Sequence, residues 1–219
     1  MKYLKRFETE ADIAVMDAPN VVFVEDVASV LYNVEPVRGV FIQHISGLLY
    51  STDQWTSHGF TNDKANGVAV ITNECKFVIA KTQISSDMDW SSDIINAVDG
   101  VVLTNDLSIA KADYAGKANT SLIAAIDTSK AAYSCANFKF PNGQKGHLPA
   151  LGEWVKAYTY KADINAAMLL INGTAMSDGS YWSSTQFAGY MAWTLNWSDG
   201  TFGTQSKDYN GIVRAFLAL

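Results

Sequence analysis

Residues 146–160 have the sequence GHLPALGEWVKAYTY, which contains the clearest helical pattern in this chain of 219 residues. Leu151, Trp154, Val155 and Tyr158 recur at spacings of 0, 3, 4 and 7, which gathers apolar side chains on one face of an α-helix. Pro149 falls in the first helical turn in this interpretation, where its missing N–H costs nothing. The pattern predicts a helix near 150–160 whose apolar face lies in a core.

Three more helices are expected from caps and spacing. The segment 163–171 repeats the same apolar spacing, with Asp163 as its cap and Asn172-Gly173 as its end. Two further helices are expected at 119–125 and 128–138, where Asn119-Thr120 and Thr128-Ser129 provide capping side chains.

Short β-rich runs predict strands on both sides of these helices. One hairpin is expected to pair 39–45 with 48–50, and another to pair 67–72 with 76–82. Together with the helices, these runs predict an α+β fold in which residues 38–219 form one domain, with helices packed on a mixed, mainly antiparallel sheet. Residues 1–36 hold two β-rich runs around an acidic turn and are expected to form an N-terminal arm, which leaves 37–219 as the main domain.

The last 39 residues, 181–219, differ from the rest of the chain in composition. Only four of them are charged, and nine are aromatic, about 23% against 12% for the whole chain. The others are mostly Gly, Ser, Thr, Asn and Ala. Tyrosine and tryptophan among small polar residues are typical of antibody-type binding surfaces, although an aromatic-rich β-sandwich core has a similar composition.

Alternation along the chain separates core from surface in this segment. Trp193, Leu195 and Trp197 share one face of a predicted strand, and Asp199-Gly200 is expected to form a two-residue hairpin turn. Ile212 to Leu219 is almost wholly apolar and is expected to form one final, central strand. The core contribution of this segment is predicted to be Trp182, Trp193, Leu195, Trp197, Val213 and Phe216.

Composition and motif inventory argue against several classes of function. The net charge of −6, without a basic run, argues against nucleic-acid binding, and the longest apolar stretches are too short for membrane insertion. The three histidines lie in unrelated contexts, and HExxH, GxSxG and the phosphate and dinucleotide glycine loops do not occur. We therefore expect no metal, no cofactor and no enzymatic activity. Cys75 and Cys135 match no metal spacing and are expected to be either buried thiols or a disulfide.

An ordered set of short motifs runs through the second half of the chain: GHLPALGEW (146–154), INAA (164–167), YWSSTQ (181–186), Ala192-Trp193, Asp199-Gly200, Lys207 and VRAF (213–216). This set resembles the pattern of bacterial C-type-lectin-like domains related to the formylglycine-generating-enzyme-like fold. The resemblance covers about residues 38–219 and implies a C-type-lectin-like fold. The activity of formylglycine-generating enzymes is not implied, because no cysteine follows Cys135. Calcium-dependent sugar binding is not implied either, because neither a Glu-Pro-Asn nor a Gln-Pro-Asp loop is present.

Within that group, the end of the chain is similar to target proteins of diversity-generating retroelements from gut bacteria and their phages. In such proteins a reverse transcriptase rewrites adenines, so that Asn-type codons come to encode a mixture of residues in a C-terminal variable region. The resemblance implies a fixed scaffold of YWSST, Ala192-Trp193, Lys207 and Val213-Arg214. Met191 and Gln205 are not reachable from an Asn codon by adenine changes, so these two depart from the pattern or belong to the scaffold.

The ligand surface expected from this resemblance lies within 181–219. Its anchors are predicted to be Phe187, Tyr190, Phe202 and Tyr209, exposed in one contiguous patch with Thr194, Ser198 and Thr201. The full set of candidate ligand-binding residues is Phe187, Gly189, Tyr190, Thr194, Asn196, Ser198, Asp199, Thr201, Phe202, Thr204, Ser206, Asp208, Tyr209 and Asn210.

The function expected from the sequence is that of a display protein which binds a protein or glycan receptor on a cell surface. A phage tail receptor-binding protein or a bacterial adhesin fits this description, and a homo-oligomer is compatible with it. The N-terminus lacks a signal-peptide pattern, so a phage virion or a cell surface is expected as the final location, with the cytoplasm before assembly. The alternative is a structural tail or fibre component that uses the same surface for assembly.

Overall fold

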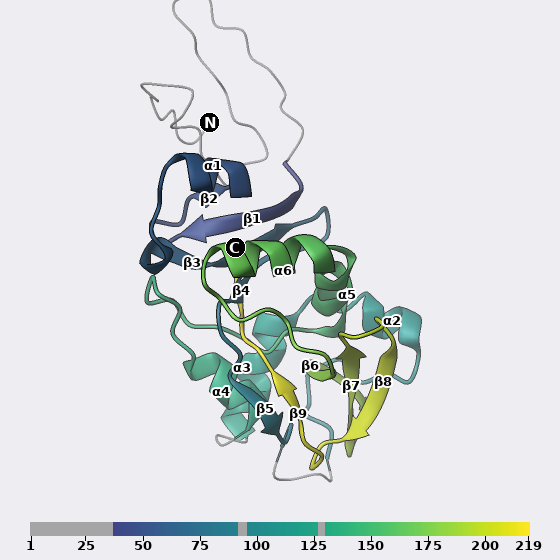
Figure 1. Ribbon diagram of the computed structural model, residues 1–219. Coiled ribbons are helices and arrows are strands. Elements are labelled where there is room, and N and C mark those ends of the chain that lie inside the picture. Colours follow the sequence, from purple (N-terminus) through teal and green to yellow (C-terminus); the bar gives the residue numbers. More distant parts are fainter. Residues whose placement is uncertain (1–36, 92–95, 127–129) are drawn as a thin grey trace, which may run out of the picture.

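The computed structural model describes residues 37–91, 96–126 and 130–219 (Figure 1). Over these ranges the chain is a mixed α+β protein with two mostly antiparallel sheets and six α-helices. The predicted N-terminal arm and the predicted helix start at Thr128-Ser129 lie outside the described residues. No helix within these ranges has the length and apolarity that a membrane span requires.

The first sheet contains both predicted N-terminal hairpins. Its strand order is β10-β4-β3-β1-β2, and its bounds are β1 Gly39–His44, β2 Leu49–Tyr50, β3 Ala65–Ile71, β4 Lys76–Ala80 and β10 Phe216–Ala218. β1 pairs with β2 across a turn at Ser46-Gly47, and β3 pairs with β4. The helix α1 (Thr52–Ser57) and a short 3₁₀ turn (Asn62–Lys64) connect β2 to β3. Both hairpin predictions are confirmed.

The second sheet holds most of the C-terminal segment. Its order is β5-β9-β6-β7-β8, with β5 Ser85–Met88, β6 Ser180–Ala188, β7 Met191–Asn196, β8 Phe202–Ser206 and β9 Gly211–Val213. β6, β7 and β8 form an antiparallel meander, whereas β9 lies parallel to β6. The single sheet expected from the sequence is therefore two sheets.

Five helices follow β5 and precede β6: α2 Leu107–Lys111, α3 Gly116–Ile126, α4 Ala131–Asn137, α5 Leu151–Thr159 and α6 Lys161–Leu170. The two predicted amphipathic helices are confirmed as α5 and α6. The predicted starts of three helices are wrong by a few residues. α3 begins ahead of Asn119-Thr120, α6 begins ahead of Asp163, and Pro149 precedes the N-cap of α5. The residues at the N-cap positions of α5 and α6, Ala150 and Tyr160, make no capping hydrogen bond through their side chains.

The start of α5 is stabilised by one nearby and one distant side chain. Its N-cap position is Ala150, whose side chain accepts no hydrogen bond. The carboxylate of Glu153 accepts a hydrogen bond from the Ala150 N–H at 2.8 Å, and the hydroxyl of Thr185 in β6 accepts one from the Leu151 N–H at 2.9 Å. The helix start is thereby attached to the second sheet.

The predicted single final strand is wrong, because the chain changes sheet within it. β9 pairs with β5 and β6 in the second sheet, and β10 pairs with β4 in the first. Arg214 lies at the crossing and is fully buried. Its Nε donates to the carbonyl of Ala80 at 2.9 Å, and its Nη2 donates to the carbonyls of Lys81 at 2.9 Å and Thr174 at 2.7 Å. This side chain joins the end of β4 and the segment that follows α6 to the crossing between β9 and β10.

Candidate ligand-binding surface

The most exposed aromatic side chains of the C-terminal segment lie at one end of the second sheet. Tyr190 lies in the β6–β7 turn and is 58% exposed, and Tyr209 lies in the β8–β9 turn and is 62% exposed. Gly189 is half-buried beside Tyr190, and Asp208 and Asn210 are exposed on either side of Tyr209. We call this group the tyrosine end. The exposure predicted for Tyr190 and Tyr209 is confirmed.

Lys207 lies at the start of the β8–β9 turn, and its side chain connects this turn to the β6–β7 turn. Its Nζ donates to the carbonyl of Gly189 at 2.7 Å, to Oε1 of Gln186 at 2.8 Å and to the carbonyl of Asn96 at 3.1 Å. It also lies 4.4 Å from the ring centroid of Trp90. The side chain is fully buried, and within the described ranges no carboxylate pairs with it. Both tyrosine-bearing turns are thus fixed to one buried cation.

Burial lowers the pKa of Lys207 from 10.5 to about 8, which predicts an unusual dependence of stability on pH. Between these values the unfolded chain holds a proton that the folded chain has lost, so stability rises with pH in that window. We expect a gain of about 2 kcal/mol for wild type relative to Lys207→Met between about pH 7 and pH 9.5, at 1.36 kcal/mol per pH unit. Urea unfolding of both proteins at each pH measures it. A parallel pH dependence of the two proteins would contradict this assignment.

The opposite end of β7 and β8 holds the second group of candidate residues. Ser198, Asp199 and Thr201 are exposed in the β7–β8 turn. Asp199 Oδ1 accepts hydrogen bonds from the Thr201 N–H at 2.9 Å and the Thr201 hydroxyl at 2.7 Å, and Lys161 donates to the carbonyl of Ser198 at 2.9 Å. We call this group the turn end. Its backbone is held by its own side chains and by α6.

The two groups are not one contiguous patch, which corrects the expectation from the sequence. Met191 pairs with Ser206 beside the tyrosine end, and Leu195 pairs with Phe202 beside the turn end. Four to five residues of strand separate them, or roughly 15 Å at 3.4 Å per residue. The candidates between them are mostly covered, since Asn196, Thr204 and Ser206 are half-buried.

Three predicted surface residues are more buried than expected. Thr194 is 2% exposed, because its cross-strand neighbour Trp182 packs into a cluster with Trp90 and Val213 that covers this face of the sheet. Phe187 and Phe202 are half-buried against Trp193 and α2, on the opposite face. Lys111 of α2 lies 4.2 Å from the ring centroid of Phe202. The sheet is therefore covered on both faces, which alternation along one strand does not reveal.

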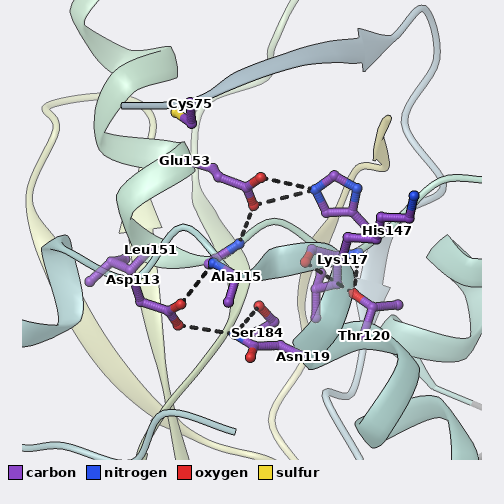
Figure 2. Close-up of polar contacts among 12 residues, drawn as sticks. Cys75, Asp113, Ala115, Lys117, Asn119, Thr120, His147, Leu151, Glu153 and Ser184 are labelled. Carbon is purple, nitrogen blue, oxygen red and sulfur yellow. Dashed lines mark hydrogen bonds and ion pairs between the residues drawn. The ribbon is translucent and has the colours of Figure 1, made fainter. Parts of the chain in front are cut away.

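The motif residues of β6 are buried and bonded. Tyr181 to Gln186 are all fully buried. Asp113 accepts a hydrogen bond from the Thr185 hydroxyl at 2.7 Å. It also accepts one from the Asn119 amide at 3.0 Å, and Asn119 donates in addition to the Ser184 hydroxyl at 3.2 Å (Figure 2). Asp113 was not identified from the sequence, because no local pattern pairs it with a strand 72 residues away.

A second candidate site is a surface cleft of about 580 Å³ beside the starts of α3 and α5, lined in part by Cys75, Tyr114, Lys117 and Glu153. Glu153 is buried, and its Oε1 lies 3.1 Å from His147 Nε2 (Figure 2). A Cβ at position 116 would lie 2.1 Å from Glu153 Oε2, so the glycine there admits this carboxylate. The Glu153 oxygens are therefore occupied by bonds within the fold.

The two cysteines are free thiols in the structure. Burial raises the pKa of Cys75 to about 11, and burial also raises that of Cys135. A thiol with such a pKa is protonated at neutral pH and is a weak nucleophile. Within the described ranges no group of three or more His, Cys, Asp or Glu side chains is placed to hold a metal ion. Cys75 in the cleft is therefore not an activated nucleophile.

Comparison with known proteins gives no assignment for this chain: no family model, no curated protein and no solved structure matches it.

Proposed function

We propose that this chain is a non-enzymatic binding protein of C-type-lectin-like fold, whose C-terminal surface holds a protein or glycan receptor. The observation that carries the proposal is the division between motif residues and the residues between them. YWSST, Lys207 and Arg214 are buried and have defined hydrogen-bond partners, whereas Tyr190, Asp208 and Tyr209 are exposed. A protein whose surface residues vary while its fold is kept needs this division, because substitutions at exposed positions cost little stability.

The tyrosine end is the better supported part of that surface. Its two tyrosine rings are rigid and amphipathic, and they extend from turns that Lys207 fixes from below. Rings held in this way lose little conformational entropy on binding. Asp208 and Asn210 flank Tyr209 and supply hydrogen-bonding groups at the same surface. This arrangement fits a receptor-binding protein of a phage tail or a bacterial adhesin, exported or assembled from the cytoplasm.

Sequencing this gene in populations of nearly identical genomes tests the proposal. Positions such as Tyr190, Asp208 and Tyr209 are expected to vary, while Tyr181–Thr185, Lys207 and Arg214 stay constant. The variable codons should differ only where a nearby template repeat carries adenine. A gene that is uniform across 187–212 would contradict the display function and favour the alternative, a structural tail or fibre component with a fixed assembly surface.

A further inference from the structure

The outer edge of β8 is open in the described part of the chain. β8 is the last strand of the second sheet, after β7, and it lies at the outer margin of the molecule (Figure 1). An open edge exposes backbone N–H and C=O groups that can pair with another strand. The pairing of β8 with β7 determines which backbone groups face this open edge.

Two hydrogen bonds fix the alternation along β8. The N–H of Asn196 donates to the carbonyl of Thr201 at 2.9 Å, and the N–H of Lys207 donates to the carbonyl of Tyr190 at 3.0 Å. In an antiparallel pair, every second residue directs its backbone groups to the partner strand. Residues 201, 203, 205 and 207 therefore face β7, and Phe202, Thr204 and Ser206 direct their N–H and C=O groups to the open edge.

These outward groups can pair with another strand, because all but the Ser206 carbonyl lack a backbone partner among the described residues and a carbonyl can accept a second hydrogen bond. Apart from the Tyr209 N–H, which donates to the Ser206 carbonyl at 2.9 Å, no backbone bond to them is made by the described residues. Edge strands of soluble proteins are usually protected by charged residues, proline or bulges. β8 has the sequence FGTQS, with neither a charge nor a proline, and its pairing with β7 is regular.

We propose that β8 pairs with β8 of a second copy of this chain, antiparallel about a two-fold axis at Thr204. The outward groups at 202, 204 and 206 are symmetric about Thr204, so this register places Thr204 opposite Thr204 of the second copy. Phe202 then lies opposite Ser206, and Gly203 opposite Gln205, where the glycine leaves room for the longer side chain.

Charges at the two ends of β8 favour this orientation. Lys111 lies 4.2 Å over the ring of Phe202 at one end, and Asp208 accepts a hydrogen bond from the Ser206 hydroxyl at 2.5 Å at the other. The Phe202 end also holds Asp199 and Lys161, whose opposite charges offset each other, so Lys111 leaves this end with a net positive charge. Antiparallel pairing brings this end of each copy to the Asp208 end of the other. Parallel pairing would place like charges together at both ends.

This pairing would also change the binding surface, an inference that rests on the proposed function. Each copy has its tyrosine end beside Ser206 and its turn end beside Phe202. In the antiparallel dimer the tyrosine end of one copy lies next to the turn end of the other, one strand spacing of about 4.8 Å away. The two groups that are separated within one chain are then joined across the interface, and each composite surface draws residues from both copies.

Sedimentation velocity of the full chain tests the dimer. One strand pair buries little surface, so we expect reversible dimerisation in the range of about 10–100 μM. Thr204→Lys places two ammonium groups opposite each other and is expected to raise the dissociation constant at least about tenfold. Thr159→Lys, the same change on the exposed face of α5, should leave it unaltered. A wild-type monomer at about 1 mM, or an unchanged dimer in Thr204→Lys, would overturn the proposal.

Cysteine cross-linking tests the register without relying on Thr204→Lys. In a Cys75→Ser, Cys135→Ala background, Thr204→Cys should form a disulfide-linked dimer on mild oxidation, because facing residues lie about 5.5 Å apart between Cα atoms. Gln205→Cys should not, since its two copies are about 8 Å apart in this register. Equal cross-linking of both variants would refute the register. Both experiments use no receptor, so a monomer whose gene still varies as expected would reject the dimer alone.

Discussion

Replacing Trp182 with alanine is expected to lower the free energy of unfolding by about 3–5 kcal/mol, the cost of removing a large buried aromatic side chain. Trp182 is fully buried, and its Nε1 donates to the carbonyl of Met88 at 2.8 Å, which ties β6 to β5. A Cβ at position 211 would lie 2.5 Å from its Nε1, so Gly211 packs directly on the indole. The neighbouring strand cannot collapse into the cavity without losing its pairing.

Tyr190→Ala and Tyr209→Ala are the matched controls for this loss. Both rings are mostly exposed, so each substitution should change stability by about 0.5 kcal/mol or less. Phe187 and Phe202 are half-buried against Trp193, and we expect intermediate losses of about 1–2 kcal/mol for their alanine variants. Urea unfolding at 25 °C orders the five variants. If Tyr190→Ala or Tyr209→Ala cost as much as Trp182→Ala, the tyrosines would be core residues and the binding proposal would lose its physical basis.

Arg214→Ala is the second substitution with a large expected effect, a loss of about 3–5 kcal/mol. It removes the donor for three carbonyl groups, on Ala80, Lys81 and Thr174, and leaves a cavity where the chain passes between the sheets. Burial lowers the pKa of Arg214 to about 10, so the group is still charged at neutral pH and its hydrogen bonds are charge-assisted.

Arg214→Lys separates the role of the charge from that of the geometry. Lysine keeps a positive charge but cannot reach three carbonyls with a planar fork, so we expect it to recover only part of the loss, leaving about 2 kcal/mol. Thermal and urea unfolding compare the two variants with wild type. Full recovery by lysine would show that the charge alone suffices, and a near-neutral Arg214→Ala would show that the sheet crossing needs no such contact.

Several elements were predictable from the sequence because their signals are local. α5 and α6 follow from apolar residues at spacings of 0, 3, 4 and 7, and the hairpins of the first sheet follow from β-rich runs that flank short turns. Trp193, Leu195 and Trp197 were placed in the core by alternation, and all three are buried. The predicted exposure of Tyr190 and Tyr209 is also observed. In each case the residues that decide the outcome are close together in the chain.

The tertiary structure decided what depends on distant partners. Residues 212–219 read as one apolar strand, but Arg214 crosses between sheets because its acceptors on Ala80 and Thr174 lie far away in the sequence. Thr194 is buried because Trp182 and Trp90 cover the face that alternation assigned to solvent. Alternation reports which side chains share a face, and only long-range packing determines whether that face is covered. For the same reason the predicted surface is divided between two ends of one strand pair.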